Sequence, residues 1–595
     1  MRKIYTTLLL FVASLTISAQ DSNAGWPAEY PGVMLQGFYW NSYSDTKWTN
    51  LASQADELSQ YFNLIWVPQS GYCNSLSNQM GYSDIWWLDH RSAFGTEDEL
   101  RSMIQTFKNK KVGIIADVVI NHKNGNTNWC DFPNESKNGY TLTWDNTNLS
   151  GICQDDECKD NGYNPTGAKD TGTPFDGCRD LDHTNATVQQ NIKTYLDFLL
   201  KDLSYTGFRY DMVGGYAPKY TGIYNTSAKP EFSVGEYWMS DGKDGLVNWI
   251  NGTKVEGVVQ SAAFDFTMKW NINKAFSNSN WELLNGEALA NDADYARYAV
   301  TFVDNHDTYR DENALKNNVC AANAYILTMP GTPCLFLPHW KDYKGSLKRL
   351  IAARKAVGIN NQSTILNASV EGAGYVLKVQ GTKGTAMLIL GGSTGVSTTG
   401  FQLVTEGRKY KLYVSDGVDI SSVTAITDTD AKTETTSVTI PSFCTVEDGE
   451  TCAFFEAPTS FGTSINCWRW DNNYNYTKNE WPGVQCTEVG PAESGKKVYK
   501  WTFKEADKKS QSSSNKGIIF SGGSKQTGDM MFANGGYYLE DGLWDSVLPT
   551  TDIRSVKGVS SQNKDASWYD LNGRRLTGEP MKKGIYIYQG KKILK

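Results

Sequence analysis

Short apolar runs alternate with helical segments between residues 30 and about 345. The runs are continuous rather than alternating, which is typical of strands buried on both faces of a parallel sheet. Helical stretches such as 97–104 and 188–200 separate them. This order predicts an α/β fold, a (β/α)8 barrel. The expected strands are 32–38, 64–67, 112–120, 207–212, 232–238, 258–266, 299–303 and 332–337.

A chain of 595 residues is too long for one core, so further domains are expected. The barrel should occupy residues 25–345. Within it, residues 123–180 form a long connection rich in Asn, Asp, Gly and Cys, which predicts an inserted loop subdomain. Alternating segments with Gly and Thr turns predict an antiparallel β domain at 346–455. A β-rich module is expected at 458–549, and a short basic tail at 550–595.

The first 19 residues have the features of a secretory signal peptide. Arg2 and Lys3 precede an apolar stretch at 8–15, and small residues at 17–19 suit cleavage before Gln20. A membrane anchor is the alternative, but the stretch is short for a bilayer, and no other run is long enough to span one. We therefore expect a protein that is exported, to the cell surface or beyond.

Composition narrows the possible partners. The formal net charge of −8 and the absence of a basic stripe argue against nucleic acid. Aromatic residues make up 12% of the chain, which fits either large cores or sugar binding. Eleven cysteines leave at least one thiol unpaired. Local disulfides are plausible outside the cytoplasm, with these candidates: Cys444/Cys452, Cys467/Cys486, and pairs among Cys130, Cys153, Cys158 and Cys178.

Several expected strands end in charged residues, and the carboxyl ends of parallel strands meet at one end of a barrel. Arg209 and Asp211 lie two apart and so share a face; the cation favours an ionised Asp211, which could attack an anomeric carbon. Glu236 would act as a general acid, kept protonated by repulsion from its neighbours. Asp307 could hydrogen-bond sugar hydroxyls. The alternatives are a structural Arg209–Asp211 ion pair and a loop-capping role for Asp307.

These segments resemble the signature regions of the α-amylase family. The four regions are Asp117-Val-Val-Ile-Asn-His122, Gly207-Phe-Arg-Tyr-Asp211, Gly235-Glu236 and Phe302-Val-Asp-Asn-His-Asp307, with a fifth short motif at Arg179-Asp-Leu-Asp-His183. The similarity covers about 30–455, and the stretch from Gly214 to Trp238 is most similar to plant-type enzymes.

The resemblance implies a role for each of these residues. Asp211 would be the nucleophile of a retaining hydrolase, Glu236 the acid/base and Asp307 the transition-state stabiliser. Arg209 would set the charge state of Asp211, and Asp117 would support the site. Sugar contacts are implied for Tyr82, which would stack, and for His122 and His306, which would donate or accept hydrogen bonds.

The sequence departs from the family at Gly214, where a lysine that contacts sugar on the leaving-group side is common. This puts subsite affinity in doubt, not the chemistry. A calcium ion is also implied, held by Asn121, Asp170, Asp180 and the carbonyl of Gly215. From spacing alone, these acids would be read as a solvated loop.

Residues 458–549 resemble small β-sandwich starch-binding modules. Trp470 and Trp481 match the stacking aromatics of such modules and Gln526 a polar contact; the alternative is that both tryptophans belong to the core. The tail resembles bacterial C-terminal sorting tails, with a plain β-hairpin as the alternative.

Together these features predict a secreted, monomeric, endo-acting α-amylase. It would hydrolyse α-1,4-glucosidic bonds in starch, glycogen and maltooligosaccharides with retention, using carboxyls about 5–5.5 Å apart. A transglycosylase of the same family, cyclodextrin-forming or glucan-transferring, is one alternative. A non-catalytic starch-capture protein is the other, but the intact set of acids argues against it.

Overall fold

The computed structural model describes most of the chain between residues 24 and 547. The described ranges are 24–154, 156–310, 313–434, 436–511 and 516–547, with short strands at 568–569, 585–588 and 591–594. The expected signal peptide and most of the expected sorting tail lie outside these ranges, so both remain predictions.

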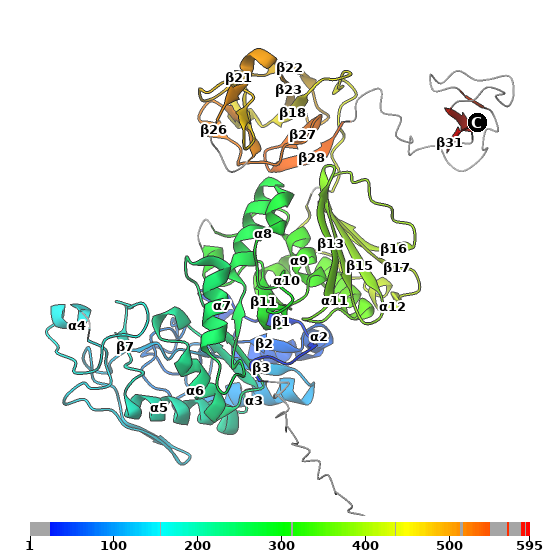
Figure 1. Cartoon of the computed structure of the whole chain (residues 1–595). Coiled ribbons are helices and arrows are strands. Elements are labelled where there is room, and N and C mark those ends of the chain that lie inside the picture. The colour runs from blue at the N-terminus through cyan, green and yellow to red at the C-terminus, as the bar shows by residue number, and fades with distance from the viewer. Residues whose placement is uncertain are drawn as a thin grey trace, which may run out of the picture.

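Within the described residues, eight parallel strands close into a barrel in the order β1-β12-β11-β10-β9-β8-β3-β2 (Figure 1). The strands are β1 (Met34–Gln36), β2 (Leu64–Trp66), β3 (Gly113–Val118), β8 (Gly207–Tyr210), β9 (Phe232–Gly235), β10 (Ala262–Phe264), β11 (Ala299–Phe302) and β12 (Thr332–Phe336). Their side chains are almost all buried, as continuous apolar runs require. The predicted (β/α)8 barrel is confirmed.

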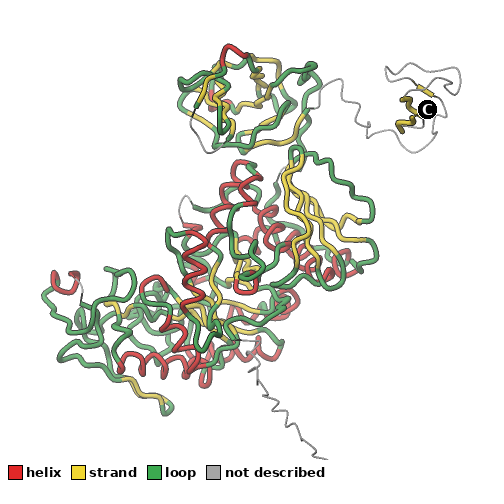
Figure 2. The backbone as a smooth tube through the Cα atoms, in the orientation of Figure 1, coloured by secondary structure: helices red, strands yellow, loops and turns green. Residues whose placement is uncertain are grey.

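Helices surround the strands (Figure 2). They are α1 (Trp48–Ser53), α2 (Ala55–Tyr61), α3 (Glu97–Asn109), α5 (Ala186–Asp197), α6 (Lys219–Ala228), α7 (Gly242–Gly252), α8 (Phe266–Asn278), α9 (Val319–Thr328), α10 (Leu337–Asp342) and α11 (Lys344–Val357). Helix α3 shows why such segments are helical. Thr96 and Glu99 form a reciprocal capping box at its start, and Leu100, Ile104 and Phe107 bury one face.

The inserted segment projects from one side of the barrel, at the lower left of Figure 1. It contains β4 (His122–Lys123), β5 (Glu135–Lys137), β6 (Tyr140–Leu142), α4 (Asp156–Asp160) and β7 (Arg179–Asp180). Strands β4 and β7 pair antiparallel, so the two ends of the segment meet at its base. The insertion is therefore anchored directly beside the third barrel strand.

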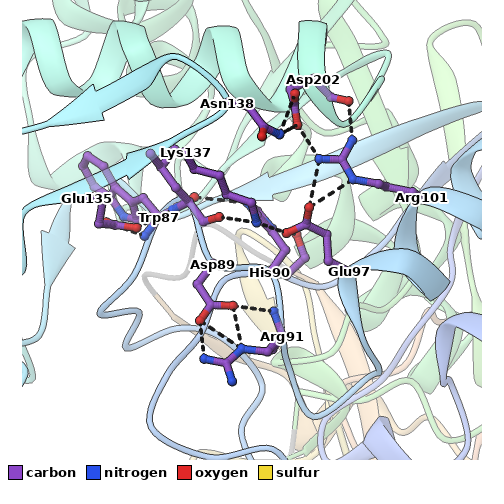
Figure 3. A network of polar contacts seen from close by, with 12 residues as sticks. Trp87, Asp89, His90, Arg91, Glu97, Arg101, Glu135, Lys137, Asn138 and Asp202 are labelled. Atoms are coloured by element: carbon purple, nitrogen blue, oxygen red, sulfur yellow. Dashed lines mark hydrogen bonds and ion pairs between the residues drawn. The ribbon is translucent and has the colours of Figure 1, made fainter.

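Polar contacts fasten the β5–β6 hairpin to the barrel (Figure 3). The Glu135 carboxylate accepts the backbone N–H groups of Trp87 and Leu88, at 2.9 and 2.6 Å. Lys137 forms an ion pair with Glu97 of α3. These contacts hold the insertion on two separate segments of the barrel domain and so limit its movement.

Two β-rich units follow the barrel. The first is a sheet ordered β13-β14-β15-β17-β16, and the second is a sandwich of sheets ordered β22-β23-β18-β27-β28 and β24-β20-β19-β25-β26. The bounds are β13 (Thr364–Glu371), β14 (Gly374–Gln380), β15 (Thr385–Gly391), β16 (Phe401–Gly407), β17 (Tyr410–Ser415), α12 (Ser421–Thr424), β18 (Cys452–Ala457), β19 (Asn466–Trp470), β20 (Tyr474–Asn475), β21 (Val484–Gln485), β22 (Thr487–Pro491), β23 (Lys497–Thr502), β24 (Lys509–Ser510), β25 (Gly517–Gly522), β26 (Lys525–Gln526), β27 (Gly536–Leu539) and β28 (Gly542–Ser546).

The structure corrects one expected boundary. Strand β18 pairs with β23 and β27, so it belongs to the sandwich module and not to the preceding β domain. The module therefore begins before residue 458.

Cys444, Cys452, Cys467 and Cys486 are buried thiols, and neither candidate pair among them is disulfide-bonded in this structure.

The module packs against the other two domains. Asp541 in the β27–β28 turn pairs with Arg408 of the β domain, and Arg408 also donates to Asn318 at the start of α9, at 2.9 Å. Asp545 accepts the backbone N–H and the hydroxyl of Ser393, at 2.9 and 2.8 Å. One arginine thus joins all three domains.

Candidate active site

Neighbouring strands β8 and β9 bring two carboxylates to the same end of the barrel. Tyr210 lies opposite Gly235 in the register, so the residues that follow, Asp211 and Glu236, leave the barrel side by side. The backbone N–H of Glu236 donates to the carbonyl of Tyr210 at 3.0 Å. Because parallel strands share one direction, this placement follows from the sequence positions.

Arg209 is the centre of the site. One terminal nitrogen lies 2.8 Å from Asp117 and 2.7 Å from Asp211, and the other lies 2.6 Å from Glu236. The guanidinium is fully buried and stacks over Trp66, with 4.8 Å to the ring centroid. The predicted contact between Arg209 and Asp211 is confirmed. A single cation faces three carboxyls, which favours retention of a proton among them.

Glu236 is suited to hold that proton. Burial raises the pKa of its carboxyl above the ordinary value, the charges of Asp211 and Asp307 raise it further, and Arg209 opposes them. The sequence predicted repulsion as the cause, but loss of solvation is the larger effect. Between the two acids, Met212 adopts a left-handed backbone (φ 44°), and its N–H approaches Glu236 at 3.3 Å. A non-glycine residue in this region marks local strain, a common feature of active sites.

Asp307 approaches the same pocket from the loop after β11. Its carboxylate lies 3.3 Å from Nε2 of His306, whose Nδ1 accepts a hydrogen bond from the Gln36 amide at 2.9 Å. The Gln36 amide therefore places the imidazole proton on Nε2, facing Asp307. Burial lowers the pKa of His306 well below its ordinary value, so the ring is neutral.

The histidines differ from expectation in their contacts. Nε2 of His122 donates to the carbonyl of Tyr82 at 3.0 Å, and its Nδ1 faces the Asn121 amide at 3.3 Å. Both ring nitrogens of His122 and of His306 are thus engaged within the protein. The predicted sugar contacts of these histidines stay a prediction. Their partners within the protein are backbone, amide and carboxylate groups that the sequence motifs do not reveal.

The predicted stacking residue Tyr82 lies in the wall of the site. Its hydroxyl donates to Asp117 at 2.8 Å, and its ring is nearly parallel to that of Trp40, with 5.8 Å between centroids. Asp117 also accepts the indole N–H of Trp66 at 3.1 Å, which agrees with the supporting role expected for it.

A cleft of about 500 Å³ contains Asp211, Glu236 and Asp307. Trp238 and Met239 line it beside Glu236, and both are more than a third exposed. A Cβ atom at Gly214 would lie 2.8 Å from the Met239 sulfur. Met239 therefore occupies the space beside Gly214, where a longer side chain would have to pass.

Sequence reasoning missed four residues of this site. Gln36 is the last residue of β1 and Trp40 lies in the loop that follows it, while Trp238 and Met239 lie two and three residues after Glu236. Their positions just beyond barrel strands were the available signal, because the residues that follow such strands line the mouth of the barrel.

Three of the residues expected to hold calcium, Asn121, Asp180 and Gly215, lie near one another. Asn121 donates to Asp180 at 3.2 Å, and its buried Oδ1 has no hydrogen-bond partner. A Cβ at Gly215 would lie 2.1 Å from that Oδ1. The segment after Asp170 packs on the same turn, since Thr173 donates to the carbonyl of Gly214 at 3.0 Å. Hard oxygen donors around an unsatisfied Oδ1 fit calcium. Among the described side chains, no group of three or more His, Cys, Asp or Glu could hold a metal ion.

The module presents a different aromatic pair from the one expected. Trp481 is 52% exposed and lies 5.8 Å from Trp468, whereas Trp470 is only 6% exposed. A Cβ at Gly517 would lie 2.9 Å from the Trp470 ring, which lies over this glycine. The prediction that Trp470 stacks on sugar is therefore wrong. Gln526 is exposed, on β26 of the same sheet as Trp468.

A parallel barrel with two neighbouring carboxyls at its carboxyl end, one of them with a pKa raised by burial, defines a glycoside hydrolase. Comparison with known proteins gives the family. The family model described as "Alpha amylase, catalytic domain" matches residues 62–345, and "Starch-binding module 26" matches residues 453–532.

Two relatives agree with this family. "Probable alpha-amylase 2" of Arabidopsis thaliana is 31% identical over 406 residues, covering 64% of this chain and 93% of that protein. "Glucan 1,4-alpha-maltotetraohydrolase" of Stutzerimonas stutzeri is 28% identical over 398 residues, covering 61% of this chain and 68% of that protein. A solved cyclomaltodextrin glucanotransferase with a three-domain ABC distribution is 16% identical, with a TM-score of 0.48. The match covers 65% of this chain and 96% of that chain. The chain belongs to the α-amylase family of glycoside hydrolases and acts on starch.

Proposed function

We propose that this protein is an endo-acting α-amylase that hydrolyses internal α-1,4-glucosidic bonds of starch and glycogen with retention. The observation that carries the proposal is the single buried Arg209 guanidinium contacting Asp211 on one nitrogen and Glu236 on the other. This holds the two carboxyls close together, as a retaining mechanism requires.

The chemistry follows from the charge states of the two carboxyls, an ionised Asp211 and a protonated Glu236. The Asp211 carboxylate attacks the anomeric carbon while the bond to the leaving glucan oxygen breaks, and that oxygen takes the proton of Glu236. Glu236, now a carboxylate, removes a proton from water; the water oxygen attacks the same carbon and releases Asp211. Asp307 hydrogen-bonds the sugar as positive charge develops.

Chromatography of the products from soluble starch tests this assignment. We expect linear maltooligosaccharides of mixed length, with a rapid fall in iodine staining because internal bonds break first. The second candidate is a glucan-transferring enzyme, supported by 26% identity over 281 residues to a cyclomaltodextrin glucanotransferase of Bacillus. Cyclic or branched products would favour it, and the absence of new reducing ends would refute both enzymes.

We infer further that calcium binds at Asn121, Asp170, Asp180 and the Gly215 carbonyl. The ion would tie the inserted segment to the turn after β8. Chelation should lower the melting temperature by about 5 °C, and added calcium should restore it. Asp180→Asn should melt lower in calcium and respond less to chelator, whereas Asp176→Asn, an exposed acid of the same segment, should behave as wild type. An unchanged melting temperature on chelation would refute the site.

The starch-binding surface of the module is proposed to be the Trp468–Trp481 pair with Gln526. Trp481→Ala should weaken binding to granular starch about tenfold and leave hydrolysis of soluble starch unchanged, because the ring lies in a separate domain. Phe443→Ala removes an exposed ring that packs against Gly490 in the opposite sheet and serves as the control. Equal losses in both variants, or loss of soluble-starch activity, would contradict this surface.

Export as a monomer to the cell surface or medium is part of the proposal, supported by the signal-like first 19 residues and by a tail similar to bacterial sorting tails. The plant-type character is supported by the 31% identity to the Arabidopsis protein. In the part of the chain that the structure describes, no helix is long and apolar enough to cross a membrane.

A further inference from the structure

A stack of flat side chains forms one wall of the cleft. The rings of Trp40 and Tyr82 are nearly parallel (4°), and Tyr82 stacks in turn on His306, with 5.3 Å between centroids. On Trp40 lies the guanidinium of Arg310, 3.8 Å from the ring centroid. Trp40 is therefore held between a cation and other rings, and it cannot turn without breaking both contacts.

Arg310 also contacts Asp307. One of its terminal nitrogens lies 3.3 Å from Oδ1 of Asp307, while the other oxygen of that carboxylate faces His306 at 3.3 Å. The backbone N–H of Arg310 donates to the Asp307 carbonyl at 3.1 Å, so both residues belong to one turn. The two carboxylate oxygens are thus each oriented by a different donor.

Stability does not account for this arrangement. The Arg310 side chain is 47% exposed and that of Asp307 is 28% exposed, and ion pairs this open to water contribute little to folding. The orientation of Asp307 is a different matter, because a carboxylate that binds a transition state must be held in place before the reaction.

We propose that Arg310 is a positioning residue, which uses the face of Trp40 as a support to hold Asp307 in its catalytic orientation. The inference rests on the proposed role of Asp307. Trp40 fixes the guanidinium, the guanidinium fixes Oδ1, and the His306 imidazole fixes Oδ2. A glucan entering the cleft then meets Asp307 already oriented.

Kinetics of Arg310 variants on p-nitrophenyl maltoheptaoside test the proposal. Arg310→Gln should lower kcat roughly tenfold with KM changed less than twofold, because orientation matters most in the transition state. Arg310→Lys keeps the cation and should recover most of kcat. The matched control is Arg91→Gln. Arg91 pairs with Asp89 at 2.6 Å (Figure 3) and lies over the Tyr72 ring, 5.3 Å from its centroid, with a 59% exposed side chain. Arg91 is not among the residues that line the cleft, so this control should keep wild-type kinetics.

Three results would overturn the inference. They are a wild-type kcat in Arg310→Gln, a change in Arg310→Gln that affects KM alone, and an equal loss of kcat in Arg310→Lys and Arg310→Gln. Asp307→Asn separates this failure from failure of the proposed function. If Asp307→Asn is inactive while Arg310→Gln is normal, the positioning role alone is wrong; if Asp307→Asn turns over normally, the role of Asp307 is wrong as well.

Discussion

Asp211→Asn is expected to lower kcat on soluble starch by about 10⁴-fold or more while leaving glucan binding close to wild type. An amide of the same shape cannot attack the anomeric carbon. The fold should survive, because Arg209 keeps its ion pair with Asp117 at 2.8 Å and its contact with the Glu236 carboxyl at 2.6 Å. Reducing-sugar release would give kcat, and migration through starch-containing native gels would report binding.

The matched control is Asp241→Asn. Asp241 is an exposed acid in the segment after β9 and accepts a hydrogen bond from Tyr237 at 2.7 Å. Removing its charge should leave kcat within twofold of wild type. Turnover at wild-type rates in Asp211→Asn would remove the nucleophile from the mechanism, and with it the retaining assignment.

Glu236→Gln is expected to have the second largest effect, a loss of about 10³-fold in kcat on starch. The loss should be much smaller on α-maltosyl fluoride, because fluoride leaves without a proton. The difference between the two substrates isolates the general-acid role. Equal losses on both would assign Glu236 to some other step.

The pH dependence of the wild-type enzyme follows from the same group. Burial raises the pKa of Glu236, so its acid form persists above the ordinary range of a carboxyl. As pH rises through this raised pKa the proton is lost, and kcat/KM should fall on the alkaline side. Glu236→Gln should lack this alkaline fall, since an amide does not titrate. An alkaline limb that remains in the variant would assign it to another residue.

Much of the fold could be predicted from the pattern of apolar and polar residues alone. Barrel strands are buried on both faces, so their apolar runs stand out in the sequence, and the residues that follow them share one end of the barrel. For this reason Arg209, Asp211, Glu236 and Asp307 could be placed together before any coordinates. The module boundary was harder to set, because the partner strands of β18 lie 40 or more residues later in the chain.

The environments of individual side chains could not be predicted from the sequence in the same way. Trp468 and Trp470 are two residues apart in one strand, and only the packing over Gly517 shows which ring is buried. The proton position on His306 depends on Gln36, 270 positions away in the chain. Burial, not repulsion, is the main cause of the raised pKa of Glu236, and burial depends on contacts from the whole barrel.

The sequence by itself therefore determined the order of the strands and the chemical groups at their ends, because strand direction and periodicity are local properties of the chain. The tertiary structure alone decided which nitrogen of His306 carries the proton, which tryptophan faces solvent and which arginine contacts Asp307. Those properties depend on contacts between residues far apart in the chain, which no local pattern records.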